Sequence, residues 1–294
     1  MELLCTSTVT LPFAQRRGSF NRAYFQNQPS IRRTSIMLAT KPGALPDFTL
    51  FGMFHLMAFL IHVSCCASND LLDVEYDRKV ERCKTRPLVT GEITLVQGWL
   101  FWALIIALLV PLVLRLNKLS IALAAVQQVL WIAYPLMKRI TYWPQAFLGL
   151  ANNWGALLGW AAVNGNLNDF RIFLPVLIAG ICWTLVYDTI YAHQDKNDDA
   201  KAGVKSTALL FGDSTRTWLL AFATICIGSL MFAGYNAHMG WPFYLGMISA
   251  FGHLLWQIYS VDLSNGFDCL MKFLSNKWFG AIVMTGMLLG RIVY

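Results

Sequence analysis

The stretch RIFLPVLIAGICWTLVYDTIY, residues 171–191, places a long apolar run between Arg171 and Asp188. A helix needs roughly 20 such residues to cross the hydrocarbon core of a bilayer, which is about 30 Å thick. This stretch therefore predicts a membrane-spanning helix. Seven further stretches of the same kind predict spans at 46–67, 95–114, 119–135, 144–163, 217–235, 241–260 and 278–294.

The composition agrees with a membrane protein. Hydrophobic residues make up 56% of the 294 residues and charged residues 13%, with a mean hydropathy of +0.51. About a quarter of a typical soluble chain is charged, so these values exclude the soluble, disordered and nucleic-acid-binding classes. Seven cysteines without a CxxC pair indicate packing thiols, not a zinc or disulfide framework. We expect an all-α bundle of transmembrane helices with the lipid bilayer as partner.

The charges between the spans predict how the bundle is oriented. Consecutive spans alternate in direction, which puts the loops 68–94, 136–143, 192–216 and 261–277 on one side of the membrane. Those loops hold 13 Lys and Arg residues, against 3 in the loops of the other side. Positive residues concentrate on the cytoplasmic or equivalent side of membrane proteins. The two long loops, 68–94 and 192–216, are therefore predicted to share one face.

The N-terminal tail, residues 1–45, does not fit this pattern. Its six basic residues would fall on the other side, and it has no stretch apolar enough for a further span. A tail rich in Arg and Ser is typical of a mitochondrial targeting segment, while unrelated sequence in place of a lost first helix is the alternative. We expect residues 46–294 to form the transmembrane domain.

The first long loop opens with the acidic run SNDLLDVEYDR, residues 68–78. Asn69, Asp73 and Asp77 recur every four residues, and Asp70 precedes Asp77 by seven, so on a helix their oxygen atoms share a face. Carboxylates stacked in this way repel each other unless a cation lies between them. Oxygen ligands favour a hard ion such as Mg²⁺, which is usually shared with substrate phosphates.

The second long loop repeats the arrangement in HQDKNDD, residues 193–199. Asp195 and Asp199 have the same four-residue spacing, and Asp188 lies two turns earlier. A solvated helix end would explain one such cluster. Two clusters on one side of the membrane favour a shared metal site.

Basic residues follow both acidic clusters, which suits the binding of a diphosphate. They are Arg78, Lys79, Arg82, Lys84 and Arg86 in the first loop and Lys196, Lys201 and Lys205 in the second. The sequence has no GxxxxGK[ST] loop for a nucleotide. A diphosphate without a nucleotide loop indicates an isoprenyl diphosphate whose apolar tail lies in the bilayer.

Two long strings resemble the UbiA-type intramembrane aromatic prenyltransferases. They are NDLLDVEYDRKVERCKTRPL, residues 69–88, and YDTIYAHQDKNDDAKAGVKST, residues 187–207. Shorter agreement at 134–139 and 153–155 extends the likeness from about residue 60 to the end. It is greatest to the eukaryotic branch that contains 4-hydroxybenzoate polyprenyltransferases and fungal meroterpenoid prenyltransferases.

The resemblance implies a role for each matching residue. Two Mg²⁺ ions would be held by Asn69, Asp73 and Asp77 and by Asp195 and Asp199, with support from Asp70, Asp188 and Asp198. The diphosphate would be bound by Arg82, Arg86, Lys138, Arg139 and Lys205. The acceptor or the cavity would be lined by Asn153, Trp154, Tyr187 and Tyr191. Of these, Asp73, Asp77, Asp195 and Asp199 would be essential for catalysis.

The activity implied is Mg²⁺-dependent transfer of a polyprenyl group, farnesyl or longer, from its diphosphate to a ring carbon of a phenolic aromatic acid. Fungal meroterpenoid or other secondary-metabolite synthesis is the first reading, and mitochondrial ubiquinone synthesis is the alternative. The enzyme would lie in an endomembrane or the mitochondrial inner membrane. An inactive relative or an ion-path transporter is a weaker alternative.

Two departures from the family pattern bear on this reading. The family has nine helices, and its first helix is not recognisable in residues 1–45. Position 74 is Val, where bacterial ubiquinone members tend to place an arginine near the acceptor carboxylate. Because of Val74, the resemblance does not identify the aromatic acceptor.

Overall fold

The computed structural model describes residues 47–78 and 83–293. This part of the chain is helical and has no β-strand. Its long helices are α3 (Phe48–Leu72), α6 (Leu95–Val113), α7 (Lys118–Ile140), α8 (Pro144–Asn153), α9 (Gly155–Asn164), α10 (Phe170–Ala192), α13 (Thr215–Asn236), α14 (Trp241–Ser260) and α15 (Gly266–Ile292). Short helices lie between them: α4 (Val74–Asp77), α5 (Pro87–Thr90), α11 (Lys196–Ala202), α12 (Thr207–Phe211) and the 3₁₀ turn η2 (Gly212–Ser214).

Five helical segments are long and apolar enough to cross a membrane, by length and composition: Phe48–Leu72, Leu95–Val113, Lys118–Ile140, Phe170–Ala192 and Thr207–Asn236. The predicted all-α, multi-span membrane bundle is therefore confirmed. Each of the eight predicted spans coincides with a helix or, at 144–163, with a pair of helices. The predicted tail at 1–45, and with it the question of a first helix, lies outside the described residues.

Several helices differ from the predicted spans. The span at 144–163 is divided at Trp154, where α8 ends and α9 begins. The last helix begins at Gly266 instead of residue 278, because the Asn265 side chain accepts hydrogen bonds from the backbone N–H groups of the first turn and caps it. Helix α7 continues to Ile140, beyond the predicted end at 135, and so carries its basic C-terminal turn on a helix.

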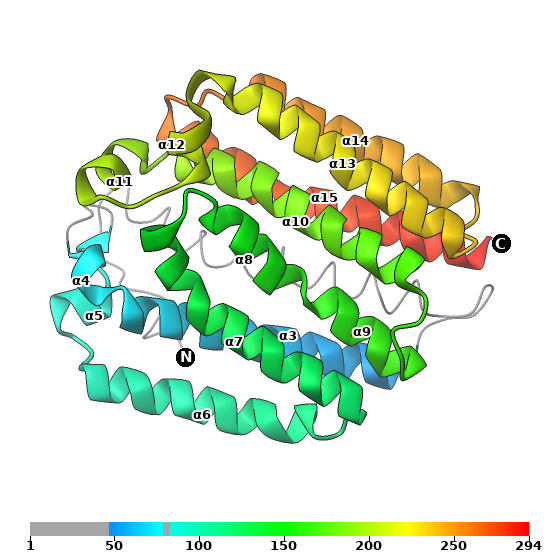
Figure 1. Cartoon of the computed structure of the whole chain (residues 1–294), viewed down its shortest axis with the longest axis horizontal. Helices are drawn as coiled ribbons and strands as arrows, with labels where there is room; N and C mark the ends of the chain where they lie inside the picture. Colours follow the sequence, from blue (N-terminus) through cyan, green and yellow to red (C-terminus); the bar gives the residue numbers. More distant parts are fainter. Residues whose placement is uncertain (1–46, 79–82, 294) are drawn as a thin grey trace.

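Helix α10 lies in the middle of the bundle, as Figure 1 shows. It packs against α8 and α9 on one side and against α13 and α15 on the other. Its buried residues continue along the helix from Phe173 to Ala192, including Asp188. A polar group on this helix is therefore surrounded by protein, not by lipid.

The short helices α4, α5, α11 and α12 all lie at one end of the bundle, at the left in Figure 1. The predicted sharing of one face by the two long loops agrees with this arrangement. The functional groups of both loops are consequently presented at the same end of α3, α7 and α10.

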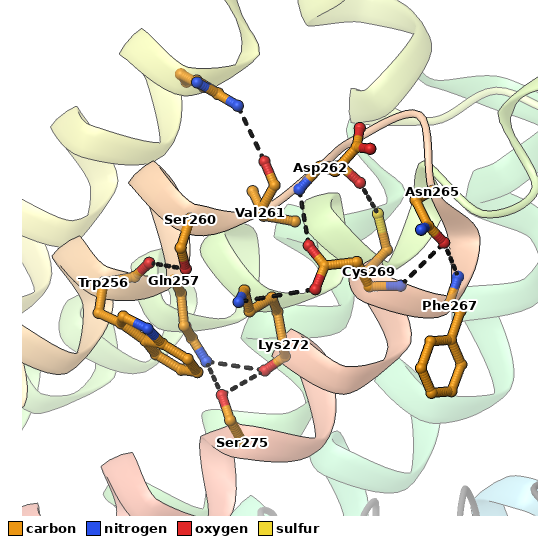
Figure 2. A network of polar contacts seen from close by, with 12 residues as sticks. Trp256, Gln257, Ser260, Val261, Asp262, Asn265, Phe267, Cys269, Lys272 and Ser275 are labelled. Carbon is orange, nitrogen blue, oxygen red and sulfur yellow. Dashed lines mark hydrogen bonds and ion pairs between the residues drawn. The ribbon is translucent and has the colours of Figure 1, made fainter.

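The turn between α14 and α15 is fixed by a polar network, shown in Figure 2. Asp268 accepts a hydrogen bond from the Asp262 backbone N–H at 2.7 Å and lies 3.7 Å from the Lys272 ammonium. Gln257 of α14 donates to the Lys272 carbonyl and to Ser275. The network ties the start of α15 to α14, at the end of the bundle that carries the acidic loops.

Candidate functional site

The first acidic motif keeps its four-residue spacing in space. The backbone N–H of Asp73 donates to the Asn69 carbonyl at 2.9 Å, and the N–H of Asp77 donates to the Asp73 carbonyl at 2.8 Å. Helix α3 ends at Leu72 with Asp73 as its C-cap, and α4 begins at Val74. Asn69, Asp70, Asp73 and Asp77 are named the acidic edge.

Three cations contact this acidic edge. Arg86 Nη1 lies 2.7 Å from Asp70 Oδ1 and 2.5 Å from Asp77 Oδ2. Lys138 Nζ and Arg139 Nη2 lie 3.8 Å and 3.6 Å from the carboxylate of Asp73. Both come from the last turn of α7, so a neighbouring helix supplies the charge compensation. The predicted cation Arg82 lies outside the described residues.

Asp73 and Asp77 are nearly buried, with 6% and 8% of their surface exposed. Burial raises the pKa of Asp73, and the Lys138 ammonium opposes this rise. Buried carboxylates gain from additional positive charge, because water no longer screens their repulsion. The acidic edge is thus prepared for a cation.

The second acidic motif begins at the end of α10. Asp188 is buried there. Asp195 precedes α11, and the backbone N–H of Asp199 donates to the Asp195 carbonyl at 2.8 Å, so the four-residue spacing is again helical. The backbone of Asp198 lies in α11, but its side chain is outside the described part.

His193 lies at the C-terminal end of α10, where the second acidic loop begins. Its Nδ1 lies 2.8 Å from the Thr189 carbonyl, and its Nε2 lies 3.5 Å from the Thr215 hydroxyl. Burial lowers the pKa of His193. The residue anchors α10 to the start of α13, a role that the sequence did not suggest.

The C-terminal turn of α7 connects the two loops. The Lys138 carbonyl accepts the backbone N–H of Lys205 at 2.9 Å, while the Lys138 ammonium lies 3.8 Å from the Asp73 carboxylate. The Lys205 ammonium donates to the Ile140 carbonyl at 3.1 Å and lies 5.5 Å from the Tyr142 ring centroid. Lys205 was predicted to bind diphosphate; in this structure its ammonium caps the end of α7.

Aromatic rings lie directly below the acidic groups. Phe273 of α15 has its ring centroid 5.5 Å from that of Tyr187 and 4.9 Å from that of Tyr191. The Lys138 ammonium lies 5.5 Å from the ring centroid of Tyr134 on α7. Rings from α7, α10 and α15 thus lie near the charged groups at this end of the bundle.

The other two predicted cavity residues are engaged in helix packing. The Asn153 amide donates to the Gly149 carbonyl and to the Thr184 hydroxyl, at 2.7 Å and 3.1 Å. The indole N–H of Trp154 donates to the Leu123 carbonyl at 3.0 Å. These bonds join α8 to α10 and the α8–α9 break to α7.

Sequence reasoning missed Asn152, the neighbour of Asn153. Its side chain is 3% exposed and its amide nitrogen lies 3.5 Å from the Tyr187 hydroxyl. Two consecutive asparagines inside an apolar stretch were the available signal. Their side chains differ by about 100° around a helix of 3.6 residues per turn, so the two face different neighbours.

The oxygen atoms of the acidic edge are suitable ligands for Mg²⁺. They are carboxylate and amide oxygens, and the Asn69 side-chain oxygen is buried without a hydrogen-bond partner among the described residues. No three His, Cys, Asp or Glu side chains of the described part meet as a ready-made metal site.

Comparison with known proteins gives the same assignment over most of the chain. The model of the UbiA prenyltransferase family matches residues 34–294. The "4-hydroxybenzoate polyprenyltransferase, mitochondrial" of Arabidopsis thaliana is 53% identical over 257 residues, which are 87% of this chain and 63% of that protein. The chain thus spans just under two thirds of that relative.

Solved structures share the fold. A UbiA homolog from Aeropyrum pernix K1 superposes with a TM-score of 0.74 at 19% identity, over 90% of this chain and 97% of that one. A UbiA homolog from Archaeoglobus fulgidus, solved with DMAPP and Mg²⁺ bound, superposes with a TM-score of 0.63 at 15% identity, over 90% of this chain and 97% of that one. At these identities the likeness concerns the helical architecture.

Proposed function

The chain belongs to the UbiA prenyltransferase family, and from this premise we propose that it transfers a polyprenyl group from its diphosphate to a ring carbon of 4-hydroxybenzoate. The observation that carries the proposal is the position of Lys138. Its ammonium lies 3.8 Å from the Asp73 carboxylate of the first motif, and its carbonyl binds the loop that follows the second motif. One helix end thereby links both acidic motifs, as one diphosphate site requires.

The similarity to the Arabidopsis relative bears on the choice between the two pathways considered from the sequence. That relative is named for 4-hydroxybenzoate and for the mitochondrion, which favours the ubiquinone alternative over the fungal meroterpenoid reading. We therefore propose 4-hydroxybenzoate as the acceptor and a mitochondrial membrane as the location. The integral membrane character follows from the helices themselves.

Mg²⁺ is the proposed cofactor, with Asn69, Asp73 and Asp77 holding one ion and Asp195 and Asp199 the other, supported by Asp70, Asp188 and Asp198. When bound, such ions withdraw electrons from the diphosphate and make it a better leaving group. The remaining chemistry belongs to the protein's own side chains.

Arg86, Lys138 and Arg139 are proposed to bind the diphosphate oxygens. They are already close to the acidic edge, within 2.5–3.8 Å of its carboxylates. Negative charge collects on the diphosphate as the bond to the allylic carbon breaks, and preorganised cations stabilise it. A ring carbon of the acceptor then forms a bond to the allylic carbon while diphosphate leaves. That ring carbon gives its proton to the released diphosphate, which restores aromaticity.

The aromatic side chains are proposed to protect the allylic cation. Tyr187 and Tyr191 pack on Phe273 at the inner side of the acidic groups. Their ring faces attract positive charge and keep water away from it. No cysteine or serine nucleophile is needed for this route.

A competition assay tests the proposed acceptor. The purified protein in detergent or nanodiscs receives Mg²⁺, geranyl, farnesyl or a longer diphosphate, and equal amounts of 4-hydroxybenzoate and a polyketide phenolic acid. We expect prenylated 4-hydroxybenzoate to predominate. Exclusive prenylation of the polyketide acid would contradict 4-hydroxybenzoate as the acceptor and favour the meroterpenoid reading. If no combination of diphosphate and aromatic acid gave a product, the proposed prenyltransferase activity would be contradicted.

A further inference from the structure

A second polar site lies deeper in the bundle, at Asn152 of α8. The side chain is 3% exposed, and its amide nitrogen lies 3.5 Å from the hydroxyl of Tyr187 on α10. Its amide oxygen is buried without a hydrogen-bond partner among the described residues. If the amide is turned by 180°, the oxygen faces Tyr187 and the nitrogen takes its place, so one end of the amide stays without a partner either way.

Helix α7 brings two more polar groups to the neighbourhood of Asn152. Gln127 donates from its amide nitrogen to the carbonyl of Ala151, the residue before Asn152, at 2.9 Å. The remaining oxygen of Gln127 and the indole N–H of Trp131 are buried without a hydrogen-bond partner in the described part of the chain. Trp131 lies one turn from Gln127 and packs edge-on against Tyr134.

These groups continue inward from the diphosphate site. The Lys138 ammonium of the proposed diphosphate site lies 5.5 Å from the Tyr134 ring centroid, and Tyr187 is the residue before Asp188. Asn152 contacts Tyr187, and Trp131 contacts Tyr134. A buried polar group without a partner costs free energy, so several of them beside one reaction site indicate a ligand.

We propose that the Asn152 amide and the Tyr187 hydroxyl hold the ring hydroxyl of the aromatic acceptor. The inference rests on the proposed function and adds residues that bind one part of its substrate. A neutral hydroxyl both donates and accepts, so it satisfies an amide whichever way the amide is turned.

The acceptor carboxylate does not fit the same place. A carboxylate buried there would need a cationic partner. The cations Lys138 and Arg139 lie at the end of α7, two helical turns beyond Trp131. The carboxylate therefore belongs at the charged end of the site and the hydroxyl at Asn152, which orients the ring with one substituent toward each end.

Equilibrium binding of 4-hydroxybenzoate and of benzoate, without prenyl diphosphate, tests this assignment. The two ligands share the carboxylate and differ in the ring hydroxyl alone. We expect the wild-type protein in nanodiscs to bind 4-hydroxybenzoate about tenfold more tightly than benzoate, as one hydrogen-bonded hydroxyl allows. In Asn152→Leu the preference should shrink to about twofold or less, while benzoate affinity stays within a factor of about two.

Asn236→Leu is the matched control, because it removes an asparagine at the opposite end of the bundle, where the side chain donates to the Phe232 carbonyl. It should keep the tenfold preference. If Asn152→Leu does not fold, Asn152→Thr and Tyr187→Phe each remove part of the same site and should each reduce the preference.

The outcomes separate the two proposals. The hydroxyl site would be overturned if folded Asn152→Leu kept the tenfold preference for 4-hydroxybenzoate over benzoate. The same holds if Asn152→Thr and Tyr187→Phe are both folded and both keep it. Either result would leave 4-hydroxybenzoate as the acceptor. A wild-type protein that binds neither ligand but prenylates another phenol would overturn the acceptor proposed above.

Discussion

The backbone carbonyl of Lys138 accepts the backbone N–H of Lys205 at 2.9 Å. The two residues are 67 positions apart in the sequence. Lys138 lies in the last turn of α7, and Lys205 lies in the loop that follows the second acidic motif. Because the Lys138 ammonium also lies 3.8 Å from Asp73 of the first motif, both acidic motifs lie at one end of the bundle.

Cysteine labelling checks this arrangement. In a protein without its native thiols, single cysteines at Thr90 and Lys201 report on the two long loops, and one at Asn166 reports on the opposite end; all three positions are exposed. A membrane-impermeant thiol reagent applied to sealed, oriented vesicles should label the first two from the same side. Labelling of Thr90 and Lys201 from opposite sides would contradict a shared site.

Arg86 neutralises two carboxylates that are proposed to assist metal binding. Its guanidinium contacts Asp70 and Asp77 at 2.7 Å and 2.5 Å. Before the diphosphate binds, the Arg86 guanidinium and Mg²⁺ compete for the same carboxylate oxygens. In the absence of substrate, Arg86→Gln should therefore bind Mn²⁺, a spectroscopic substitute for Mg²⁺, about tenfold more tightly than the wild type.

The same substitution should weaken binding of the prenyl diphosphate, because a cation proposed to hold its oxygens is lost. Glu75→Gln serves as a control, since Glu75 lies in the same loop but is exposed and pairs with Arg78. Electron paramagnetic resonance of Mn²⁺ gives the affinities. Weaker Mn²⁺ binding by Arg86→Gln would show that the arginine does not compete with the ion.

Asn276 fixes the helix that carries the second motif. Its side-chain oxygen accepts the indole N–H of Trp183 at 2.9 Å, and its nitrogen donates to carbonyls of its own helix. Asn276→Leu leaves the buried Trp183 N–H without a partner, so we expect a loss of about 1–2 kcal/mol in the free energy of unfolding. Unfolding in mixed micelles measures it, with Asn236→Leu as the control. An unchanged free energy would mean that this bond adds nothing to the α10–α15 contact.

Tyr191 contributes an aromatic face beside the proposed cation. Its ring centroid lies 4.9 Å from that of Phe273. Tyr191→Ala should raise the ratio of hydrolysed prenyl alcohol to coupled product, because water reaches the cation. Tyr191→Phe keeps the ring and should leave the ratio near that of the wild type. Chromatography of both products gives the ratio, and equal ratios in the Ala and wild-type proteins would count against the shielding role.

Much of the fold was predictable because the membrane imposes a simple rule. Apolar stretches of about 20 residues must become helices in lipid, and the spacing of Asn69, Asp73 and Asp77 fixed a common helical face. The beginning of α15 at Gly266 was missed, since that turn contains Asp268 and Lys272 and is too polar to count as a span.

The site was predictable where a residue type demands one kind of chemistry. Carboxylates at helical spacing with nearby arginines indicated a metal and a phosphate. Sequence alone did not reveal that the Lys205 ammonium bonds to the end of α7, because that depends on a tertiary contact. Nor did it distinguish Asn152 from Asn153, because their roles depend on which neighbouring helix each faces.

The central claim is that both acidic motifs form one metal–diphosphate site for carbon prenylation. The most direct test compares the product and the rate of the wild type with those of variants that lack one carboxylate of either motif. Purified wild-type protein, Asp77→Asn and Asp199→Asn are each incubated with a prenyl diphosphate, 4-hydroxybenzoate and Mg²⁺, and the product is identified by mass spectrometry and NMR. We predict that the wild-type product carries the prenyl group on a ring carbon and that no product forms in EDTA. Either variant should stay folded and lose roughly 10²-fold or more of the rate. A wild-type rate from either variant, full activity in EDTA, or an O-prenyl ether as the product would contradict a shared metal–diphosphate site for carbon prenylation.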